Sequence, residues 1–592
     1  MASTPYVARL ERPVRGVKEV FVRTRAMTFI VLFVTVVGVS LSGELDPEDL
    51  RFAPGTKSVL DWSPVPGAEA YGIDSHTIPN FGSNDCAATG IAETTFVFEP
   101  TPAPGQALGI SISGQRRNPS NGEFATSGSC PWVVFVDPHA TGLNSGMNWR
   151  DAYTSVETAL LAAIDGSPYD PYDPVEFNVE FWISGPIVES VEVQPAFPRR
   201  PTLSLSLLGG FSGWEWSVSQ RAPVYGPTSW SGGLSFSQNQ VRILLDGFNF
   251  EVGSRITTRG TGDGQTPRLE VRRCSLFSTE VSVLTEDHAA PLAVTRSTLL
   301  DSNVSVNAYT PVDDTMFGDH RLQITRNHFV RSTLHVNMSV WATGGGMNGL
   351  YLVDIQQNRF EDSPVPISFR SDLNEGGHDY LEVAGKIASN VFVNAAEAAI
   401  QSWNFLQHFG SVVPPREVIF DPEIINNTAL GCARFLRLQV ESRPNWLWGY
   451  DPNSRNRCQP RLINNIIDNA TVAGIDERPD DETIGESTDP ISLNNVFWRS
   501  PVLLIDEGTT PIDNVGDLND IAECSANSIF DPLFTNASTG DIHLLPDSPA
   551  IDRGLECPVD GMDIDGRSRV VDGDGDGNAT CDLGADEYEP AQ

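Results

Sequence analysis

Between residues 270 and 530 the chain repeats a short pattern: an apolar residue, two or three polar residues that usually include Asn, and then a bulky apolar pair. Two copies are Ile324-Thr-Arg-Asn-His-Phe-Val330 and Ile387-Ala-Ser-Asn-Val-Phe-Val393. The central positions of the nine copies, called the pivots here, are Cys274, Ser297, Asn327, Asn358, Asn390, Asn427, Asn465, Asn495 and Asn527. Neighbouring pivots lie 23 to 38 residues apart, and a period in this range indicates a solenoid.

The repeat predicts a parallel β-helix. A helical solenoid needs apolar residues at helical spacing over a dozen positions, whereas these repeats contain short β-rich runs interrupted by Asn, Ser, Asp and Gly. Asn suits a tight turn because it tolerates the left-handed backbone region, and stacked Asn amides can bond along a pile of coils. Asn-rich phrases also occur in β-sandwiches, but the long period favours the β-helix. Since one coil needs roughly 20 to 25 residues, the gaps 390–427 and 427–465 predict the largest loops.

The segment 47–131 has the pattern of a small, separate β-sandwich. Short alternating strands are separated by turn signals such as Pro102-Ala-Pro-Gly105. Trp62 lies on one predicted strand and Tyr71 near the next, and this arrangement resembles the core of a fibronectin type III domain. The resemblance implies a spacer or a binding module.

Residues 133–222 open the second domain. A strand at 133–136 precedes a turn-rich loop, and residues 149–163 then have helical spacing. The predicted buried face of this helix consists of Ala152, Val156, Ala159, Leu160 and Ala163. Because an open sheet edge invites aggregation, we expect the helix to cap the first coil.

Both ends of the β-helix region carry a family resemblance. The runs VFVDPHATGLNSGMNWRDAYTSVETAL and LLGGFSGWEWSVSQR resemble the opening of secreted bacterial right-handed parallel β-helix proteins of the pectin-lyase-like superfamily. The runs DPLFTNASTGDIHLLPDSPAIDRG, DIDGRSRVVDGDGDG and DLGADEYE resemble the C-terminal region of β-helix proteins grouped as choice-of-anchor Q. The resemblance covers residues 133–590 and implies an architecture, not a reaction.

The expected fold is therefore all-β, a right-handed parallel β-helix solenoid preceded by a small β-sandwich. We expect a signal peptide, a fibronectin type III-like sandwich, an N-terminal cap with the first coils, further coils, and a C-terminal cap with an acidic Asp/Gly loop. Their bounds are 1–42, 47–131, 133–222, 223–535 and 536–592.

The N-terminus has the pattern of a secretory signal. The apolar run Phe29–Val39 follows Arg23 and Arg25, and small residues follow it. The run is short for a membrane span. Cleavage after Ser42 would leave no membrane span and a secreted or cell-surface protein. An uncleaved anchor is the alternative, and Met27 is an alternative start.

The net charge of the chain limits the kinds of partner that it can bind. The chain has 592 residues with 39 Lys and Arg against 77 Asp and Glu, which gives a formal net charge of −38. Nucleic acid is excluded as a partner, because phosphate binding needs clustered Lys and Arg. Such charge suits a soluble extracellular protein that binds cations, and plain solubility is the alternative explanation. We expect the protein to be a monomer.

Eight cysteines in an exported chain suggest disulfides. Proximity in the sequence pairs Cys86 with Cys130, Cys432 with Cys458, and Cys557 with Cys581. Cys274 and Cys524 lie in the repeat and suit small buried apolar positions. Sequence alone leaves the connectivity open.

The strongest candidate site is Asp572-Gly-Asp-Gly-Asp-Gly-Asn578. Alternating carboxylates offer hard oxygens to one cation and match the start of the EF-hand loop rule. The twelfth position departs from the rule, because it is Leu583 instead of Glu. We expect a structural Ca²⁺, and a solvated acidic turn is the alternative. The expected ligands are Asp572, Asp574, Asp576, Asn578 and Asp582, with Asp563 and Asp565 close in sequence.

Aromatic residues in one of the longest loops suggest a carbohydrate-binding surface. Flat rings stack on sugar faces, and Arg pairs with uronic-acid carboxylates. The expected binding residues are Trp446, Trp448, Tyr450 and Arg443. The alternative is a loop that packs its own aromatics over the solenoid.

Catalysis is less clearly indicated. Catalysis in the superfamily that the chain resembles takes two forms: lyases, in which a base removes a proton beside a uronate carboxylate, and hydrolases with paired carboxylates on adjacent coils. Acidic and His residues between coils are Asp313, Asp314, Asp319, His320, Glu375, His378 and Asp379. None matches a diagnostic motif, so we assign no catalytic residue. We expect a binding or structural role toward carbohydrate or extracellular matrix, and the alternative is a polysaccharide lyase or glycoside hydrolase acting on acidic polysaccharide.

Overall fold

The structure is a computed structural model of the 592-residue chain. Before residue 132 it describes strands β1 to β8 only. From there it describes residues 132–146, 149–166, 177–193, 203–214, 221–222, 228–237, 241–260, 268–286, 291–311, 320–341, 347–374, 379–407, 417–443, 455–479, 486–557 and 561–590. The chain forms two compact units, Met1–Gly185 with Phe197–Ala222 and Gly226–Thr228, and Pro186–Ala196 with Pro223–Tyr225 and Ser229–Gln592.

The first unit contains two small sheets, and two of their strands lie before residue 47, outside the bounds predicted for the sandwich. Its five-stranded sheet has the order β1 (Val17–Arg23), β2 (Phe29–Thr35), β8 (Ala107–Gln115), β5 (Ala70–Ile78) and β6 (Asn84–Ile91). Its three-stranded sheet has the order β3 (Arg51–Phe52), β4 (Val59–Asp61) and β7 (Thr95–Val97). The apolar run of the predicted signal is thus a strand in the full-length chain, and its removal stays a prediction. Among the described residues, no helix is long and apolar enough to cross a membrane.

The first unit also contains three parallel strands and a helix. These are β9 (Trp132–Val136), β10 (Phe177–Ser184), β13 (Leu203–Phe211) and α1 (Val156–Gly166). The helix begins later than the helical spacing predicts, but its predicted inner face is at most 1% exposed. It lies beside β9, which is the edge strand of this group.

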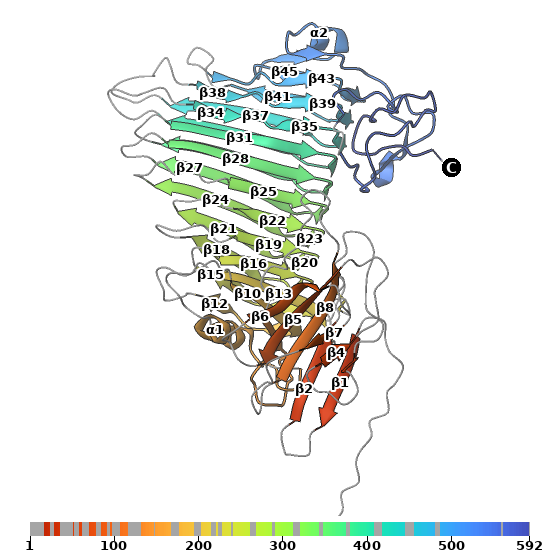
Figure 1. The fold of residues 1–592 in the computed structure, drawn as a ribbon. Coiled ribbons are helices and arrows are strands. Elements are labelled where there is room, and N and C mark those ends of the chain that lie inside the picture. Colours follow the sequence, from red (N-terminus) through yellow and green to blue (C-terminus); the bar gives the residue numbers. More distant parts are fainter. Residues whose placement is uncertain are drawn as a thin grey trace, which may run out of the picture. The chain divides into compact units, whose positions relative to one another are not determined.

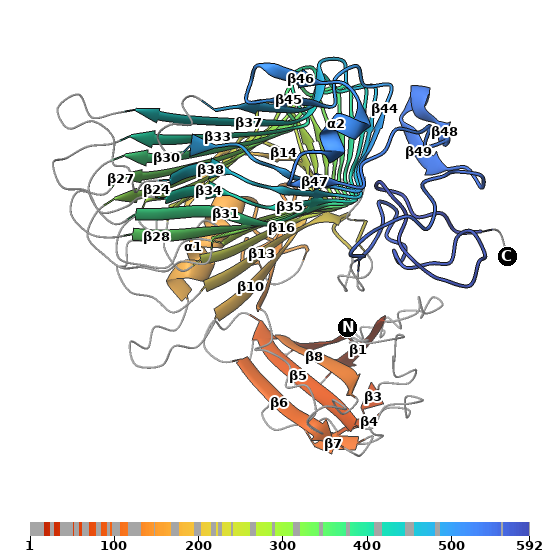
Figure 2. The same cartoon turned by 90° about the horizontal axis from the view of Figure 1, so that it is seen from above.

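The second unit is a parallel β-helix (Figure 1). Consecutive strands go in turn to three sheets, sheet 1, sheet 2 and sheet 3, and each strand pairs with the strand one coil away. Figure 2 shows the same stack of coils from above. This confirms the predicted solenoid.

The strand bounds follow for each sheet. In this unit sheet 1 contains β16 (Val241–Asp246), β19 (Arg268–Arg272), β22 (Leu292–Thr295), β25 (His320–Thr325), β28 (Met347–Gln356), β31 (Asp379–Ala388), β35 (Glu423–Ile425), β39 (Arg461–Ile463), β43 (Ile491–Leu493) and β47 (Cys524–Ser525), and β34 (Glu417–Phe420), β38 (Arg455–Cys458) and β42 (Glu486–Ser487) extend it from β31. Sheet 2 contains β11 (Ile187–Val188), β14 (Ser229–Ser231), β17 (Asn249–Phe250), β20 (Ser275–Phe277), β23 (Thr298–Leu300), β26 (His328–Val330), β29 (Arg359–Glu361), β32 (Val391–Val393), β36 (Thr428–Leu430), β40 (Ile466–Asp468) and β44 (Val496–Trp498). Sheet 3 contains β12 (Val191–Val193), β15 (Gly233–Phe236), β18 (Arg255–Gly260), β21 (Glu280–Glu286), β24 (Asn303–Pro311), β27 (Thr333–Trp341), β30 (Ile367–Asn374), β33 (Ile400–Gln407), β37 (Arg434–Arg443), β41 (Ala473–Arg478), β45 (Leu504–Asp506) and β46 (Thr510–Ile512).

The nine pivots form the corner between sheet 1 and sheet 2. From Asn327 to Asn527, each pivot amide donates to the side-chain oxygen of the next pivot at 2.9–3.3 Å. The backbone N–H of Ser297 donates to Asn327 Oδ1, and that of Cys274 to Ser297 Oγ. The predicted Asn ladder is confirmed. It satisfies buried backbone donors that a sheet ladder does not reach at a corner.

One detail of this corner differs from the prediction. The left-handed residue is the one before each pivot, because the pivot side chain must point into the stack to bond its neighbour. Nine residues, with φ between 51° and 58°, occupy this place: Arg273, Arg296, Arg326, Gln357, Ser389, Asn426, Asn464, Asn494 and Ala526. Their side chains therefore leave the corner outward.

A second ladder, at the corner between sheet 2 and sheet 3, was not predicted. Here the backbone N–H groups of Thr279, Ser302 and Ser332 donate to the hydroxyl of the next coil at 2.9–3.0 Å. Between the corners the core is filled by stacked apolar side chains. Phe329, Phe360 and Phe392 stack with ring centroids 4.6 and 5.1 Å apart.

Near the end of the solenoid, β45 pairs antiparallel with β46, and α2 (Val515–Asn519) then leads to β47, the final strand of sheet 1. The chain then turns back as the flank segment, defined here as residues 533–557 and 561–590. It contains β48 (Phe534–Asn536), the 3₁₀ turn η3 (Ala537–Thr539) and β49 (Asp541–Leu544). We expected a cap at the end of the solenoid here, but this segment lies along the side of the stack.

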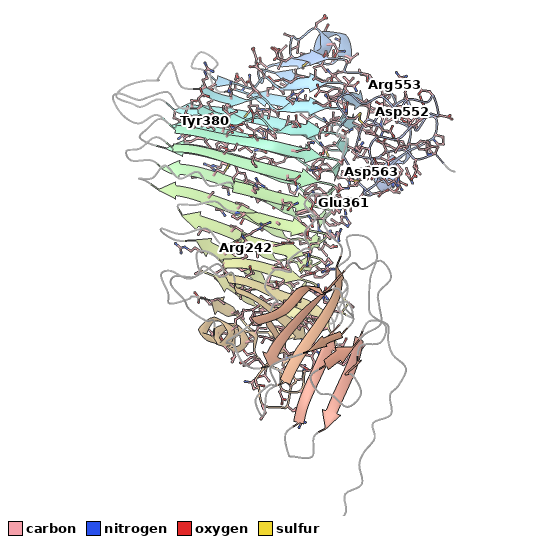
Figure 3. All side chains as sticks on the ribbon, in the orientation of Figure 1. Arg242, Glu361, Tyr380, Asp552, Arg553 and Asp563 are labelled. Carbon is pink, nitrogen blue, oxygen red and sulfur yellow. A yellow bond between two sulfur atoms is a disulfide. The ribbon has the colours of Figure 1, made fainter. Side chains whose placement is uncertain are left out.

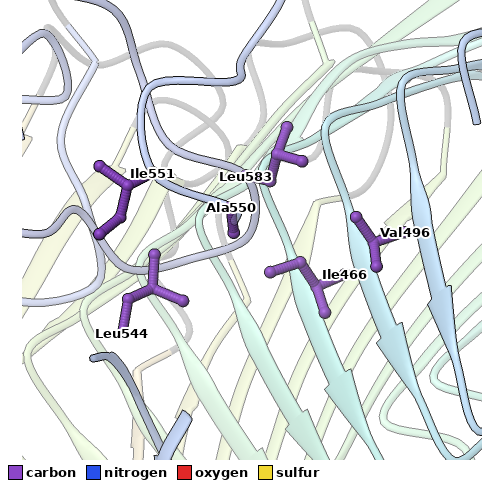
Figure 4. Packing of buried hydrophobic residues seen from close by; sticks show 6 residues of the cluster. All are labelled: Ile466, Val496, Leu544, Ala550, Ile551 and Leu583. Atoms are coloured by element: carbon purple, nitrogen blue, oxygen red, sulfur yellow. The ribbon is translucent and has the colours of Figure 1, made fainter. Parts of the chain in front are cut away.

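The flank segment packs on the outer face of sheet 2. Ile466 and Val496 contact Leu544, Ile551 and Leu583 in one buried cluster (Figure 4). Outward side chains before the pivots add polar contacts along several coils. The amide of Asn464 exchanges two hydrogen bonds with the backbone of Leu555, and those of Asn426 and Asn494 donate to Asp582 O and Arg553 O.

Candidate functional site

The outer face of sheet 3 carries aromatic and Arg side chains side by side. Burial alternates along β33, where Ser402, Asn404 and Leu406 face inward and the residues between them face outward. The strand register then aligns outward residues of neighbouring coils. One row contains Asn307, Asn337, Arg370, Trp403 and Gln439, and the next pairs Phe405 with Glu441.

Two Arg–aromatic pairs define this surface, which we call the aromatic face. The guanidinium carbon of Arg370 lies 4.5 Å from the ring centroid of Trp403. That of Arg443 lies 5.3 Å from the ring centroid of Phe405, and Arg443 Nε donates to Glu441 Oε1 at 2.8 Å. Both rings are half-buried, so part of each remains accessible. The face of an aromatic ring attracts a cation through the ring quadrupole. This attraction orients each guanidinium over its ring, so no further carboxylate is needed to hold it there.

The aromatic face includes one of the predicted carbohydrate-binding residues. Arg443 ends β37 and is exposed, with 63% of its side chain accessible. Trp446, Trp448 and Tyr450 lie outside the described residues. The sequence reasoning missed Arg370, Trp403 and Phe405, because they lie in different repeats and only the register brings them together.

A cluster of titratable side chains lies on the outer face of sheet 1. It consists of Tyr380 and Glu382 of β31, Glu417 of β34, Asp421 just after β34, and Arg457 of β38, and Figure 3 labels Tyr380 on this sheet. The Tyr380 hydroxyl donates to the Glu382 carboxylate. Arg457 Nη2 lies 4.0 Å from Glu417 Oε2.

The surroundings of Asp421 disfavour its ionised form. Burial, and then repulsion from Glu382, raises its pKa. Among the described atoms, neither Asp421 Oδ1 nor Arg457 Nε has a hydrogen-bond partner. A carboxyl with a raised pKa beside a second carboxylate is the combination used in general acid–base catalysis.

The sequence reasoning named other acidic residues for this role. Asp313, Asp314, Asp319, Glu375 and His378 lie outside the described residues, and His320 and Asp379 are described only as parts of β25 and β31. The alternation of Tyr380 and Glu382 along one strand was the only local signal of the cluster.

The acidic loop of the flank segment gathers three carboxylates. Ligand atoms of Asp552, Asp572 and Asp574 lie within 4.8 Å of one another. Asp572 accepts from the backbone N–H groups of Gly575 and Gly577 at 2.8 and 3.0 Å. Asp552 is 20 residues before Asp572 and was not predicted.

The other predicted ligands, Asp576, Asn578 and Asp582, are not part of this group of three carboxylates. Asp576 accepts from Asn578 N at 2.7 Å. Asp582 is buried, and its two oxygens accept from Asp552 N and Tyr588 N at 2.7 and 2.6 Å. Burial raises the pKa of Asp582 to about 7. Leu583, which takes the twelfth position, is buried in the contact with Ile466 and anchors the loop.

One of the predicted disulfides is present in the described residues. Cys557 and Cys581 are bonded, with Cα atoms 5.6 Å apart. The Cys86–Cys130 prediction falls outside the described side chains.

The Cys432–Cys458 prediction is wrong, because both are free buried thiols. Cys432 takes a corner position of the second ladder, where its thiol contacts Phe392 O and Leu430 O at 3.7 Å. The Ser302 hydroxyl contacts the equivalent carbonyls four coils earlier. Cys458 instead lies 3.7 Å from the Ser402 hydroxyl. Cys274 and Cys524 are buried free thiols, as predicted.

Comparison with known proteins adds no relative: no family model, curated protein or solved structure matches the chain.

Proposed function

We propose that this chain is a secreted or cell-surface protein whose aromatic face binds acidic polysaccharide. The observation that carries the proposal is the pair of half-buried rings, Trp403 and Phe405, each with an Arg guanidinium over it. Flat rings offer a surface to the apolar face of a sugar, and Arg offers donors to a uronate carboxylate. Arg443 shares its charge with Glu441, but its guanidinium and that of Arg370 still offer donors to an acidic ligand on a chain whose net charge is −38.

The sequence resemblances support the same proposal. The repeat, the opening of residues 133–222 and the C-terminal runs resemble secreted β-helix proteins of the pectin-lyase-like superfamily with a choice-of-anchor Q ending. The sandwich resembles a fibronectin type III module. The Cys557–Cys581 disulfide suits an oxidising, extracellular compartment.

We further propose that Asp552, Asp572 and Asp574 bind a structural Ca²⁺. The donors are all carboxylate oxygens, which suit a hard cation, and their ligand atoms lie within 4.8 Å of one another. A bound cation would relieve the repulsion between three neighbouring carboxylates. The loop belongs to the flank segment, so Ca²⁺ would stabilise that segment and not the aromatic face.

The test is binding of the purified chain, with Ca²⁺, to immobilised pectin, alginate, glycosaminoglycans and neutral plant glycans. We expect retention on an acidic glycan and at least about tenfold weaker binding for Trp403→Ala, because buried aromatic anchors dominate interfaces. Phe277→Ala is the matched control, since Phe277 is 40% exposed on sheet 2, a different face. Equal binding by Trp403→Ala and the wild type would reject the aromatic face as the binding site.

The cluster on sheet 1 favours an alternative function, a polysaccharide lyase or glycoside hydrolase. Its raised Asp421 pKa and the Tyr380–Glu382 contact are the specific observations for it. The test incubates the chain with the same glycans and measures the absorbance of unsaturated uronates and the release of reducing ends. Turnover that Asp421→Asn and Tyr380→Phe abolish would establish this alternative, and no turnover on any glycan would reject it for this panel.

A further inference from the structure

The flank segment contains a second cluster of metal-ligating side chains, apart from the acidic loop. His543 lies in β49, Asp565 in the turn after Asp563, and Asp586 near the end of the described chain. One ligand atom from each of His543, Asp565 and Asp586 lies within 4.8 Å of the others. Figure 3 labels Asp563 on this segment, beside the solenoid.

The His543 ring is held between two carboxylates. Its Nδ1 lies 2.5 Å from Asp541 Oδ1, and its Nε2 lies 2.9 Å from Asp565 Oδ2. A carboxylate on one ring nitrogen fixes the tautomer and aims the other nitrogen, as in the carboxylate–histidine–metal arrangement of metal sites. Here Asp541 orients the ring and Nε2 is the nitrogen aimed at the cluster.

Two buried carboxylate oxygens converge on this cluster without a hydrogen bond. Asp563 is 0% exposed and Asp586 is 3% exposed. Among the described atoms, Asp563 Oδ2 and Asp586 Oδ1 have no hydrogen-bond partner. Both face the same guanidinium nitrogen, Arg567 Nη1, at 3.9 and 3.8 Å, which is too long for a hydrogen bond. Buried charge is costly unless a cation or donor meets it at close range.

Arg567 is the group that fills the space between these carboxylates. Its Nη2 lies 3.1 Å from Asp565 Oδ2, while its side chain is 44% exposed. It can therefore turn toward solvent without leaving a cavity in the core. A compact divalent ion could approach Asp563 and Asp586 more closely than a planar guanidinium.

We propose that His543, Asp565 and Asp586, with the Asp563 carboxylate beside them, bind Zn²⁺, and that Arg567 takes the place of the ion when it is absent. One imidazole nitrogen with carboxylate oxygens suits Zn²⁺, whereas Ca²⁺ takes oxygen ligands only. On binding, Nε2 of His543 gives up its proton and ligates the ion, Nδ1 keeps its bond to Asp541, and the guanidinium moves out. The ion would tie together β49, the 563–567 turn and the end of the flank segment.

The experiment measures Zn²⁺ binding to the metal-stripped full chain by calorimetry, with Co²⁺ as a spectroscopic probe of the coordination. We expect one site that His543→Ala and Asp586→Asn each weaken at least about tenfold, because each removes a ligand. Arg567→Gln should bind Zn²⁺ more tightly than the wild type, since the competing cation is gone.

Three controls separate this site from the rest of the molecule. His328→Ala removes a half-exposed His that lies 3.4 Å from Glu361 on sheet 2, and Zn²⁺ binding should be unchanged. Asp574→Asn, in the acidic loop, should weaken Ca²⁺ binding and leave Zn²⁺ binding unchanged. Circular dichroism verifies that each variant is folded. The proposal is overturned if Zn²⁺ binds neither the wild type nor Arg567→Gln, or if it binds His543→Ala and Asp586→Asn as tightly as the wild type.

Discussion

The outer face of sheet 2 differs between the coils that the flank segment covers and the coils before them. One outward row is exposed or half-exposed in the early coils and buried in the later ones, although the strand register is the same throughout. In chain order this row contains Ser275, Thr298, His328 and Arg359, followed by Val391, Thr428, Ile466 and Val496. The fold fixes which residues point outward, and contact with the flank segment decides whether those residues are buried.

The corner residues before the pivots change in the same way. They are Arg273 and Arg296 in the coils before the flank segment, Arg326 at its edge, where Gly566 lies beside the guanidinium, and Gln357, Ser389, Asn426, Asn464, Asn494 and Ala526 in the later coils. Asn426 and Asn464 can reach flank carbonyls at 2.8 and 2.7 Å, a distance at which the longer Arg side chain would not fit against the backbone. A substitution in a coil that the flank segment covers should therefore change the stability of the protein differently from one in an uncovered coil.

The largest expected effect is that of Arg569→Met. Arg569 is 1% exposed and donates to Gly584 O at 2.6 Å, to Ser389 Oγ at 3.2 Å and lies 3.5 Å from Glu587. Its loss leaves buried acceptors unpaired and should lower the free energy of unfolding by about 3–5 kcal/mol. Urea denaturation of the wild type and the variant measures this difference in the free energy of unfolding.

The matched control for Arg569→Met is Arg331→Met on an uncovered corner. Arg331 pairs with Asp301 at 2.7 Å, and both side chains are half-exposed. Because both charges stay solvated, this pair should contribute far less to the free energy of unfolding than Arg569 does. Equal losses for the two variants would contradict the difference between covered and uncovered coils.

The next effect is that of Ile466→Ala in the covered part of the outward row. Ile466 is 0% exposed and packs on Leu544 and Leu583. Its truncation should cost about 2–5 kcal/mol and speed proteolysis of the flank segment. His328→Ala changes the same row in an uncovered coil and should leave both the stability and the proteolysis rate nearly unchanged.

Alkaline pH should weaken the covered region. Burial raises the pKa of Glu587 to about 9, and the carboxylates around His543 raise the pKa of that ring to about 9. Each folded-state pKa lies above its unfolded value, so each group binds its proton more tightly when folded. The stability that the bound protons contribute is lost as pH rises toward about 9.

The slope from Glu587 should reach about 1.4 kcal/mol per pH unit above its unfolded pKa. The change of the free energy of unfolding with pH is measured by urea denaturation at about pH 6 and about pH 9. Glu587→Gln keeps the shape of the side chain and cannot ionise, so it should flatten the curve. An unchanged slope in this variant would show that Glu587 is not the group responsible.

The smallest effect belongs to the open face of sheet 3. Asn337→Ala removes the 2.9 Å bond to Asn307, in which water can replace the lost partner. The expected cost is under about 1 kcal/mol. Asn427→Ala removes the same kind of bond at a pivot that is 0% exposed and should cost more, because it leaves backbone donors unpaired in the core. Comparable losses at the two positions would contradict the argument.

The sequence by itself determined the elements that depend on local order. The nine pivots, the inner face of α1 and the Cys557–Cys581 bond follow from spacing along the chain, because strand alternation, helical periodicity and short loops are local properties. The sequence also indicated the acidic loop, although not Asp552 as its partner.

Only the tertiary structure decided which side chains of separate coils meet. The pairing of Arg370 with Trp403, the cluster around Asp421 and the separation of Cys432 from Cys458 depend on strand register and on loops of unequal length. The position of the flank segment depends on the apolar outer face of sheet 2. In the sequence, the strands of this face cannot be distinguished from strands that are buried inside the solenoid. Periodicity determines whether a residue faces inward or outward. Which residue it contacts is determined by the packing of distant segments, which depends on their shape and charge.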